Sequence, residues 1–345
     1  MRRSALILLL LSLLVLAFRA EKTRPILPKH FPKPVYDFKK NPPSAEKILL
    51  GRALFYDPIL SADSSVSCAS CHSPFNAFAH VDHNLSHGIH DQIGTRNAPA
   101  LFNLAWQKQL MWDGAINHLD MQALAPISHP KEMAEKIDHV VLKLNRSKLY
   151  QKLFFSAYND SVVTGEHLLK ALSQFQLTLV SAESKYDSVM VQKAQFTEQE
   201  QKGYLLFKQH CNVCHTEPLF TSLNFENNGL AVDPKLNDFG RWDITHQSAD
   251  SLLFKVPTLR NLEYTYPYMH DGRFKKISQV LRHYSSGIEH GPTLSKALEQ
   301  PMQMSPNDEV DIVAFLLTLS DRKFLFNPSY SFPKEVFFSS AKGSQ

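Results

Sequence analysis

Apolar side chains recur every three or four residues through much of the chain, which is the spacing of one face of an α-helix. This periodicity predicts amphipathic helices over residues 46–56, 133–158, 165–186, 276–284 and 305–319. No stretch alternates apolar and polar residues as a series of paired strands would. The pattern therefore predicts a mostly α fold with few or no strands.

A further helix is indicated by residues 196–200, Phe-Thr-Glu-Gln-Glu. Thr197 and Glu200 have the spacing of a capping box, and Phe196 stands where a hydrophobic staple residue packs. A helix that begins here leads into the second pair of cysteines, and we expect a domain boundary near residues 193–196.

The N-terminal residues carry signals for export. Residues 1–20 combine a charged start, Met-Arg-Arg, with an apolar run from Ala5 to Phe18. Such a start is typical of a secretory signal, and the run is too short for a comfortable transmembrane span. We therefore expect export to the periplasm, with an uncleaved membrane anchor as the alternative. Residues 21–43 are rich in proline and lysine, which predicts an extended lead-in on the surface.

The strongest signal of organisation is an internal repeat. The first copy has C-x-x-C-H at residues 68–72, P-x-L-x-N at 99–103 and MWDG at 111–114. The second copy has the same order of motifs, at residues 211–215, 257–261 and, reading MHDG, 269–272. Seven residues separate the last two motifs in both copies. We interpret the copies as two related domains, residues 44–193 and 194–330, followed by a tail at 331–345.

Composition narrows the classes of function. Of the 345 residues 43% are hydrophobic, and 37 Lys+Arg against 33 Asp+Glu leave a net charge of +4. That content suffices for two packed cores, but a nucleic-acid binder would carry a concentrated basic surface, so no nucleic-acid partner is expected. The chain has 12 glycines and neither GxGxxG nor a P-loop motif, which argues against nucleotide binding.

The four cysteines form two C-x-x-C-H motifs, the attachment signal for haem c. In such a motif two thiols bind the haem vinyl groups and the adjacent histidine ligates the iron. Zinc, a redox-active dithiol and structural disulfides are the alternatives, but the two pairs lie much further apart than the roughly 15–20 residues typical of zinc pairs. The sequence predicts two covalently attached haem c groups, held by Cys68, Cys71, His72, Cys211, Cys214 and His215.

The sequence resembles the bacterial dihaem cytochrome c peroxidase family, including relatives of the MauG type, which mature methylamine dehydrogenase. The resemblance rests on LFYDPILSADSSVSCASCH, GTRNAPALFN, MWDG, CNVCH, VPTLRNL and TYPYMHDGR, spread between about residue 51 and residue 319. It implies two cytochrome c-like haem domains. The N-terminal haem would be the peroxidatic one, and the C-terminal haem would store and relay electrons.

The resemblance also implies roles for Trp112 and Glu132. The tryptophan of MWDG lies between the two haems in the family, and its easily oxidised ring implies an electron relay; a large core aromatic is the alternative. The family's acid/base glutamate follows 20 residues later, at the position of Glu132. A carboxylate there would take a proton from peroxide and return it to the departing hydroxide. The alternative for Glu132 is a solvated charge beside Lys131.

Many family members have a removable histidine ligand on the peroxidatic haem. Here the loop after the first motif contains four histidines: His80, His83, His87 and His90. An alignment without gaps places Ile89 at the ligand position, and a small shift brings in His87 or His90. Either of these is a candidate gating ligand. The alternative is a solvent-facing cluster and a haem that is open from the start.

At the C-terminal haem the ordinary peroxidases have a distal methionine 14 residues after the HDG histidine, and that position here is Tyr284. Tyrosine is the ligand in the MauG type, and a phenolate lowers the haem potential. A buried tyrosine without iron contact is the alternative, and His283 is an outside candidate. Asn97, Thr265 and Pro267 match family positions that hold a calcium ion through oxygen atoms, two of them on the backbone.

These inferences favour an exported dihaem peroxidase that reduces hydrogen peroxide to water with electrons from a small cytochrome c or copper protein. Tyr284 favours an alternative within the family, a MauG-like oxidase that withdraws electrons from a protein or a small organic substrate. A non-catalytic dihaem electron carrier is the third interpretation. Dimers are common in the family, so a homodimer is an alternative to a monomer.

Overall fold

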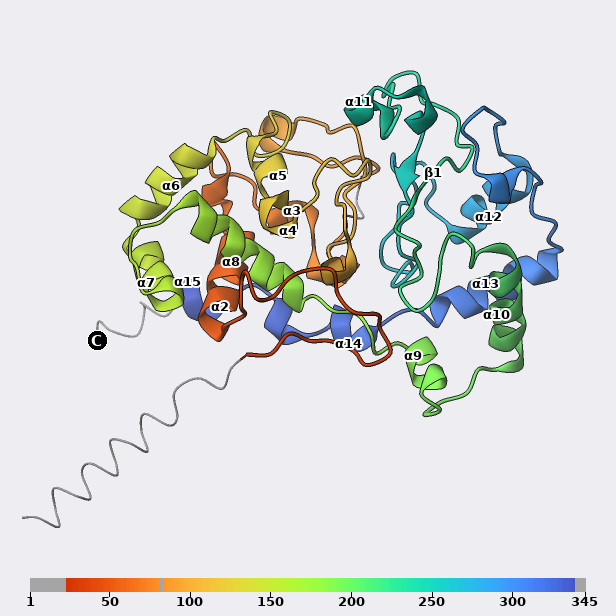
Figure 1. Cartoon of the computed structure of the whole chain (residues 1–345), viewed down its shortest axis with the longest axis horizontal. Helices are drawn as coiled ribbons and strands as arrows, with labels where there is room; N and C mark the ends of the chain where they lie inside the picture. The colour runs from red at the N-terminus through yellow and green to blue at the C-terminus, as the bar shows by residue number, and fades with distance from the viewer. Residues whose placement is uncertain (1–22, 81–82, 339–345) are drawn as a thin grey trace, which may run out of the picture.

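The computed structural model describes residues 23–80 and 83–338, and helices dominate it (Figure 1). The α-helices are α2 (Ala45–Tyr56), α3 (Cys68–Cys71), α4 (Leu119–Gln122), α5 (Leu124–Ser128), α6 (Ile137–Arg146), α7 (Lys148–Tyr158), α8 (Gly165–Thr178), α9 (Lys185–Met190), α10 (Glu198–His210), α11 (Trp242–Thr245), α12 (Ile277–Ser286), α13 (Pro306–Leu317), α14 (Arg322–Leu325) and α15 (Lys334–Phe337). Short 3-10 helices lie at Pro58–Leu60, Pro74–Asn76, Ile89–Asp91, Leu104–Trp106, Ser248–Asp250, Lys296–Leu298 and Pro328–Tyr330. Strands β1 (Phe225–Glu226) and β2 (Phe254–Lys255) pair antiparallel, with Phe225 opposite Lys255. The predicted mostly α fold is confirmed.

Two lobes are seen in Figure 1, the N-terminal half on the left and most of the C-terminal half on the right. Each lobe has its own hydrophobic cluster. In the first lobe α2 packs on α8, and in the second α10 packs on α13. Gly51 and Gly203 make these contacts in the same way, because a Cβ atom on either would lie 1.9 Å from a carbonyl oxygen, that of Ala171 or of Asp311. The shared close approach supports duplication of one module.

Two predicted helices are shorter than the periodicity indicates. Residues 133–158 form α6 and α7, because Ser147 leaves the helical conformation and its side chain accepts a hydrogen bond from the amide of Tyr150. Helix α8 ends before residue 186, because the backbone N–H and C=O of Ser181 both bond to the side-chain amide of Asn103. Apolar spacing continues across both breaks and therefore does not reveal them.

The other predicted helices are confirmed by α2, α12 and α13. The predicted capping box is also present. Thr197 accepts a hydrogen bond from the backbone N–H of Glu200, and the Glu200 carboxylate accepts one from the backbone N–H of Thr197. Helix α10 leads directly into the second C-x-x-C-H motif, since Cys211 follows the last residue of the helix.

The two MxDG turns join the lobes in a reciprocal way. The backbone N–H of Asn97 donates to the carbonyl of His270 at 2.7 Å, and the backbone N–H of Lys255 donates to the carbonyl of Trp112 at 2.7 Å. Each turn is thus held by the segment that precedes the P-x-L-x-N motif of the other lobe. This pairing fixes Trp112 at the interface between the lobes.

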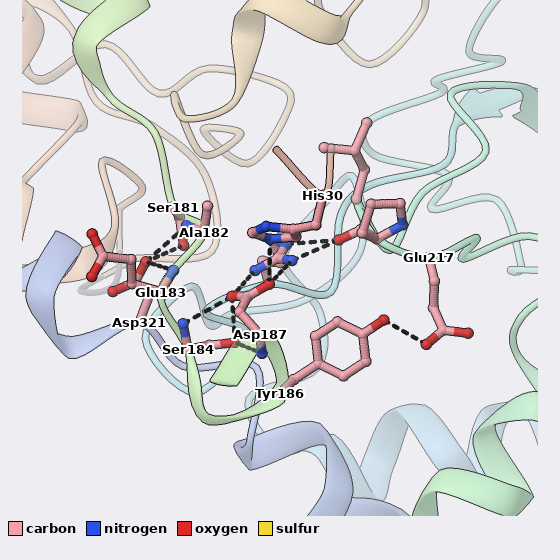
Figure 2. Close-up of polar contacts among 12 residues, drawn as sticks. His30, Ser181, Ala182, Glu183, Ser184, Tyr186, Asp187, Glu217 and Asp321 are labelled. Carbon is pink, nitrogen blue, oxygen red and sulfur yellow. Dashed lines mark hydrogen bonds and ion pairs between the residues drawn. The ribbon is translucent and has the colours of Figure 1, made fainter. Parts of the chain in front are cut away.

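A buried ion pair forms a second junction, drawn in Figure 2. The guanidinium of Arg260 is fully buried and binds both oxygens of Asp187, at 2.7 and 2.8 Å. His30 lies 3.0 Å from the same carboxylate. The rings of Phe31 and Phe220 flank the guanidinium. Asp187 therefore ties together the lead-in, the linker between the lobes and the C-terminal module.

The last described helices return to the N-terminal lobe. Phe324, Leu325 and Tyr330 belong to its hydrophobic cluster, and Tyr56 donates a hydrogen bond to the carbonyl of Tyr330 at 2.5 Å. The boundaries predicted at residues 193 and 330 stay predictions. In Figure 1 the blue helix α15 lies next to α2 of the N-terminal half, and an ion pair between Arg52 and Glu335 joins the two helices.

The lead-in, as far as it is described, contains no helix or strand between residues 23 and 43 and buries two side chains, Phe31 and Asn41. The predicted signal at residues 1–20 lies outside the described residues. No helix within residues 23–80 and 83–338 is long and apolar enough to cross a membrane.

Asp187→Ala is expected to lower the free energy of unfolding by about 3–5 kcal/mol, because it leaves the Arg260 guanidinium buried without its partner. Denaturant unfolding of the holoprotein, followed by circular dichroism, measures this loss. Glu335→Ala is the matched control, since it breaks an ion pair with Arg52 in which the Glu335 side chain is 58% exposed. The control should cost less than about 1 kcal/mol, and equal losses in both variants would contradict the prediction.

Candidate functional site

The first C-x-x-C-H motif is a single helical turn, α3, that ends at His72. The thiols of Cys68 and Cys71 are free, and the Nδ1 atom of His72 lies 2.8 Å from the carbonyl of Phe78. A carbonyl oxygen only accepts, so Nδ1 carries the hydrogen and Nε2 keeps a lone pair. Burial lowers the pKa of His72 to about 4, so the imidazole is neutral at neutral pH. This is the state in which histidine binds a metal.

The second motif repeats the arrangement. The Nδ1 atom of His215 lies 3.1 Å from the carbonyl of Pro257 and 3.3 Å from that of Phe220. Burial lowers its pKa to about 4 as well. Both motifs therefore present two free thiols and a neutral imidazole whose Nε2 is available.

A cavity of about 270 Å³ adjoins the second motif. Cys211, Cys214 and His215 line one part of it, Trp112 of the other lobe lines another, and most of the remaining wall is apolar. Paired thiols, an available imidazole nitrogen and an apolar wall are the donor set and the surroundings that a haem c requires. The residues present therefore fit this group.

Tyr284 lies in the same cavity, on helix α12. Burial raises the pKa of its phenol to about 12, and a hydrogen bond from the side chain of Asn228 acts in the opposite direction. The neighbouring His283 instead places Nε2 2.9 Å from the carbonyl of Asn228 and does not line the cavity. Of the two candidates, the structure brings Tyr284 together with His215.

Glu132 lies beside the first motif. Its carbonyl accepts a hydrogen bond from the backbone of Ile89 at 2.8 Å, and a Cβ atom on Gly88 would lie 2.5 Å from the Cα atom of Glu132. The thiol of Cys71 donates to the carbonyl of His87 at 3.4 Å. Segment 87–89 is therefore packed between Glu132 and the haem-attachment cysteines.

The carboxylate of Glu132 is half-buried, and burial raises its pKa, while the nearby His129 at 3.8 Å acts in the opposite direction. Its negative charge also raises the pKa of the thiols of Cys68 and Cys71, although burial is the larger cause for both. A carboxyl group with a raised pKa is suited to accept and return a proton.

Three of the four histidines of the loop lie side by side, and the fourth is turned away from them. The ring of His87 lies 4.3 Å from that of His83, and the ring of His83 lies 5.6 Å from that of His80. His90 is turned outward, with its side chain 71% exposed and 3.7 Å from Asp63. Of the two candidate gating ligands, His87 adjoins the first motif and His90 does not.

Asn97 connects the relay candidate to the predicted calcium site. The indole N–H of Trp112 donates to the carbonyl of Asn97 at 2.8 Å, and the Asn97 side-chain amide donates to the carbonyl of Pro267 at 2.6 Å. The other side-chain atom, Oδ1, is buried and has no hydrogen-bond partner among the described residues. Thr265 lines the same cavity. A buried amide oxygen beside backbone carbonyls fits a hard cation such as Ca²⁺.

Arg96 escaped the sequence analysis. It forms an ion pair with Asp113 of the MWDG turn and binds both oxygens of Asp238 in the other lobe, at 2.6 and 2.7 Å. The repeat offered no signal for it, because Phe254 stands at the same place in the second copy.

Known proteins resemble the chain over most of its length. Residues 45–195 match the model of a family described as di-haem cytochrome c peroxidase. The methylamine utilization protein MauG of Methylorubrum extorquens is 37% identical over 87% of this chain and 84% of that protein. The cytochrome c peroxidase Ccp of Escherichia coli is 33% identical over 85% of this chain and 62% of that protein. Among solved structures, a MauG-like protein associated with microbial copper homeostasis has a TM-score of 0.79 at 30% identity, covering 90% of this chain and 99% of that one.

Replacing both Cys68 and Cys71 with alanine should leave one covalent haem per chain instead of two, because each motif holds its own group. Mass spectrometry of the denatured protein counts the attached haems. Replacing Cys211 and Cys214 is the matched control and should also leave one. Two covalent haems in either double variant would contradict the assignment.

Proposed function

The chain belongs to the di-haem cytochrome c peroxidase family, and on that premise we propose that it reduces hydrogen peroxide to water with electrons from a small cytochrome c or copper protein. The observation that supports this proposal is the position of Glu132, half-buried beside the first C-x-x-C-H motif. The protein acts in the periplasm, reached through the signal at residues 1–20.

Peroxide is reduced next to His72. When bound there, haem c supplies the iron at which the oxygen–oxygen bond is broken. Glu132 takes the proton from one peroxide oxygen and delivers it to the other as that oxygen leaves, so that two electrons and two further protons complete two water molecules. Burial raises the pKa of Glu132, which favours uptake of the proton from peroxide.

Trp112 passes electrons between the lobes. Its indole N–H is held by the carbonyl of Asn97, and its own carbonyl is held by the backbone of Lys255. Because both the ring and the backbone of Trp112 are held, the indole keeps a constant distance to each C-x-x-C-H motif. Asn97, Thr265 and Pro267 would hold a calcium ion, and these residues would thereby fix the segment whose carbonyl accepts the indole hydrogen bond.

A MauG-like oxidase is the second candidate function. It is favoured by the placement of Tyr284 in the cavity with His215, where both side chains would hold the haem iron. In that case the protein withdraws electrons from a protein or a small organic substrate.

His87 is the gating ligand in the peroxidase, and His90, which is turned outward, is the weaker candidate.

Glu132→Gln should lower kcat for peroxide about 100-fold or more, because the amide cannot take up the proton. In the wild type, activity should fall on the acid side as Glu132 becomes protonated, at a pH above the usual range of a glutamate because its pKa is raised. Steady-state turnover with a reduced cytochrome donor measures both effects. The exposed Glu299→Gln is the matched control, and unchanged turnover in Glu132→Gln would rule out the acid/base role.

Peroxide consumption by the fully oxidised protein, without any electron donor, separates the two candidate functions. A peroxidase gated by His87 should consume peroxide only after one haem has been reduced, and His87→Gly should remove this requirement. Stopped-flow absorbance with one equivalent of peroxide measures the reaction. Rapid consumption by the oxidised wild type would contradict gating and favour the oxidase.

A further inference from the structure

The internal repeat relates the predicted calcium site to a second set of residues across the lobe interface. Aligning the two copies of P-x-L-x-N and MxDG pairs the positions as follows: Asn97 with Lys255, Gln107 with Thr265, Gln109 with Pro267 and Trp112 with His270. Each residue of the calcium site therefore has a counterpart on the Trp112 side. The counterpart of the asparagine is a lysine.

The backbone hydrogen bonds agree with this alignment of the two copies. The N–H of Asn97 donates to the carbonyl of His270, and the N–H of Lys255 donates to the carbonyl of Trp112, both at 2.7 Å. The isolated bridge between Leu110 and Ile116 likewise recurs between Tyr268 and Phe274. The two sites are thus equivalent in position as well as in sequence.

The side chains at the two sites reach equivalent carbonyls. The Asn97 amide nitrogen lies 2.6 Å from the carbonyl oxygen of Pro267, and the Lys255 ammonium lies 2.9 Å from the carbonyl oxygen of Gln109. The ammonium also donates to the side-chain oxygen of Gln107 at 2.5 Å. A positive charge is therefore built into the chain among the counterparts of the residues of the predicted calcium site.

The surroundings of the ammonium are those of a bound cation. Its side-chain hydrogen bonds go to uncharged amide-type oxygens, the kind of oxygen that a calcium ion also accepts from a backbone. Burial lowers the pKa of Lys255 to about 8, while the charge of Asp113 acts in the opposite direction. A buried charge that keeps these bonds holds its oxygen partners firmly, because leaving them unpaired is costly.

We infer that Lys255 is a positioning residue for Trp112, a tethered cation that holds segment 107–112 against the C-terminal lobe as a bound calcium ion would hold segment 265–270. The ammonium bonds to residues 107 and 109, and the backbone of the same lysine bonds to residue 112. One residue of the C-terminal lobe thus holds three residues of the segment that leads to and includes Trp112. Unlike a calcium ion, this cation cannot be removed by a chelator.

Hydrogen–deuterium exchange of the holoprotein tests the inference. Lys255→Met should speed the exchange of segment 107–113 about tenfold or more, because Gln107 and Gln109 lose the donor that they share. Segment 265–271 should change less than about twofold and serves as the internal control. Lys255→Arg, which keeps a cation and several donors, should restore slow exchange. Lys235→Met makes the same chemical change at an exposed lysine of the same lobe and should have no effect.

Unchanged exchange in segment 107–113 of Lys255→Met would overturn the inference, and so would an equal increase in both segments. Treatment of the wild type with EGTA should leave segment 107–113 protected. Loss of protection there would show that a metal ion, and not the ammonium, holds the segment. If Lys255→Met fails to fold, Gln107→Leu removes one of the two acceptors and should give a smaller increase in the same segment.

A kinetic arm rests on the relay proposed for Trp112. Lys255→Met should lower kcat about tenfold and leave KM for peroxide unchanged, because the proposed peroxide site lies next to His72 and not next to Lys255. In a Trp112→Phe background the lysine substitution should cause no further loss. If Trp112→Phe alone leaves kcat unchanged, the relay proposal fails, and the exchange measurement still decides the role of Lys255. An additive loss in the double variant would overturn the action of Lys255 through Trp112.

Discussion

The pair of backbone hydrogen bonds between the MxDG turns is the interaction on which the rest of the arrangement depends. Asn97 and Lys255 each donate to the turn of the opposite lobe. A rotation of one lobe relative to the other would strain both bonds, because they run in opposite directions across the interface. The position of Trp112 relative to the C-terminal lobe follows from this constraint. The electron path proposed through Trp112 would require such a fixed interface, because relative motion is the default for two lobes joined by a small interface.

Burial at the two motifs prepares the histidines for their task. His72 and His215 are desolvated and hydrogen-bonded through Nδ1 to carbonyl groups, so each stays neutral with a defined tautomer. The same burial acts differently on Glu132, whose pKa it raises. One physical effect therefore keeps the imidazoles neutral and favours the protonated form of the carboxyl group, because burial always penalises the charged form.

The sequence could predict the features that depend on particular residue types at a short, fixed spacing. Covalent attachment requires two cysteines and a histidine in one turn, so both motifs are visible without a structure, and the capping box of α10 is equally local. Contacts between distant residues leave no such trace. The end of α8 at Ser181 depends on Asn103, and the bond of Arg96 to Asp238 crosses the lobes. The choice between His87 and His90 likewise depends on the path of a loop, which periodicity does not describe.

The return of α14 and α15 to the first lobe has a consequence for the order of folding. During synthesis the N-terminal lobe leaves the ribosome first, yet Phe324 and Tyr330 complete the aromatic packing around Phe78. The carbonyl of Phe78 orients His72. The first motif is therefore finished only after almost the whole chain has emerged.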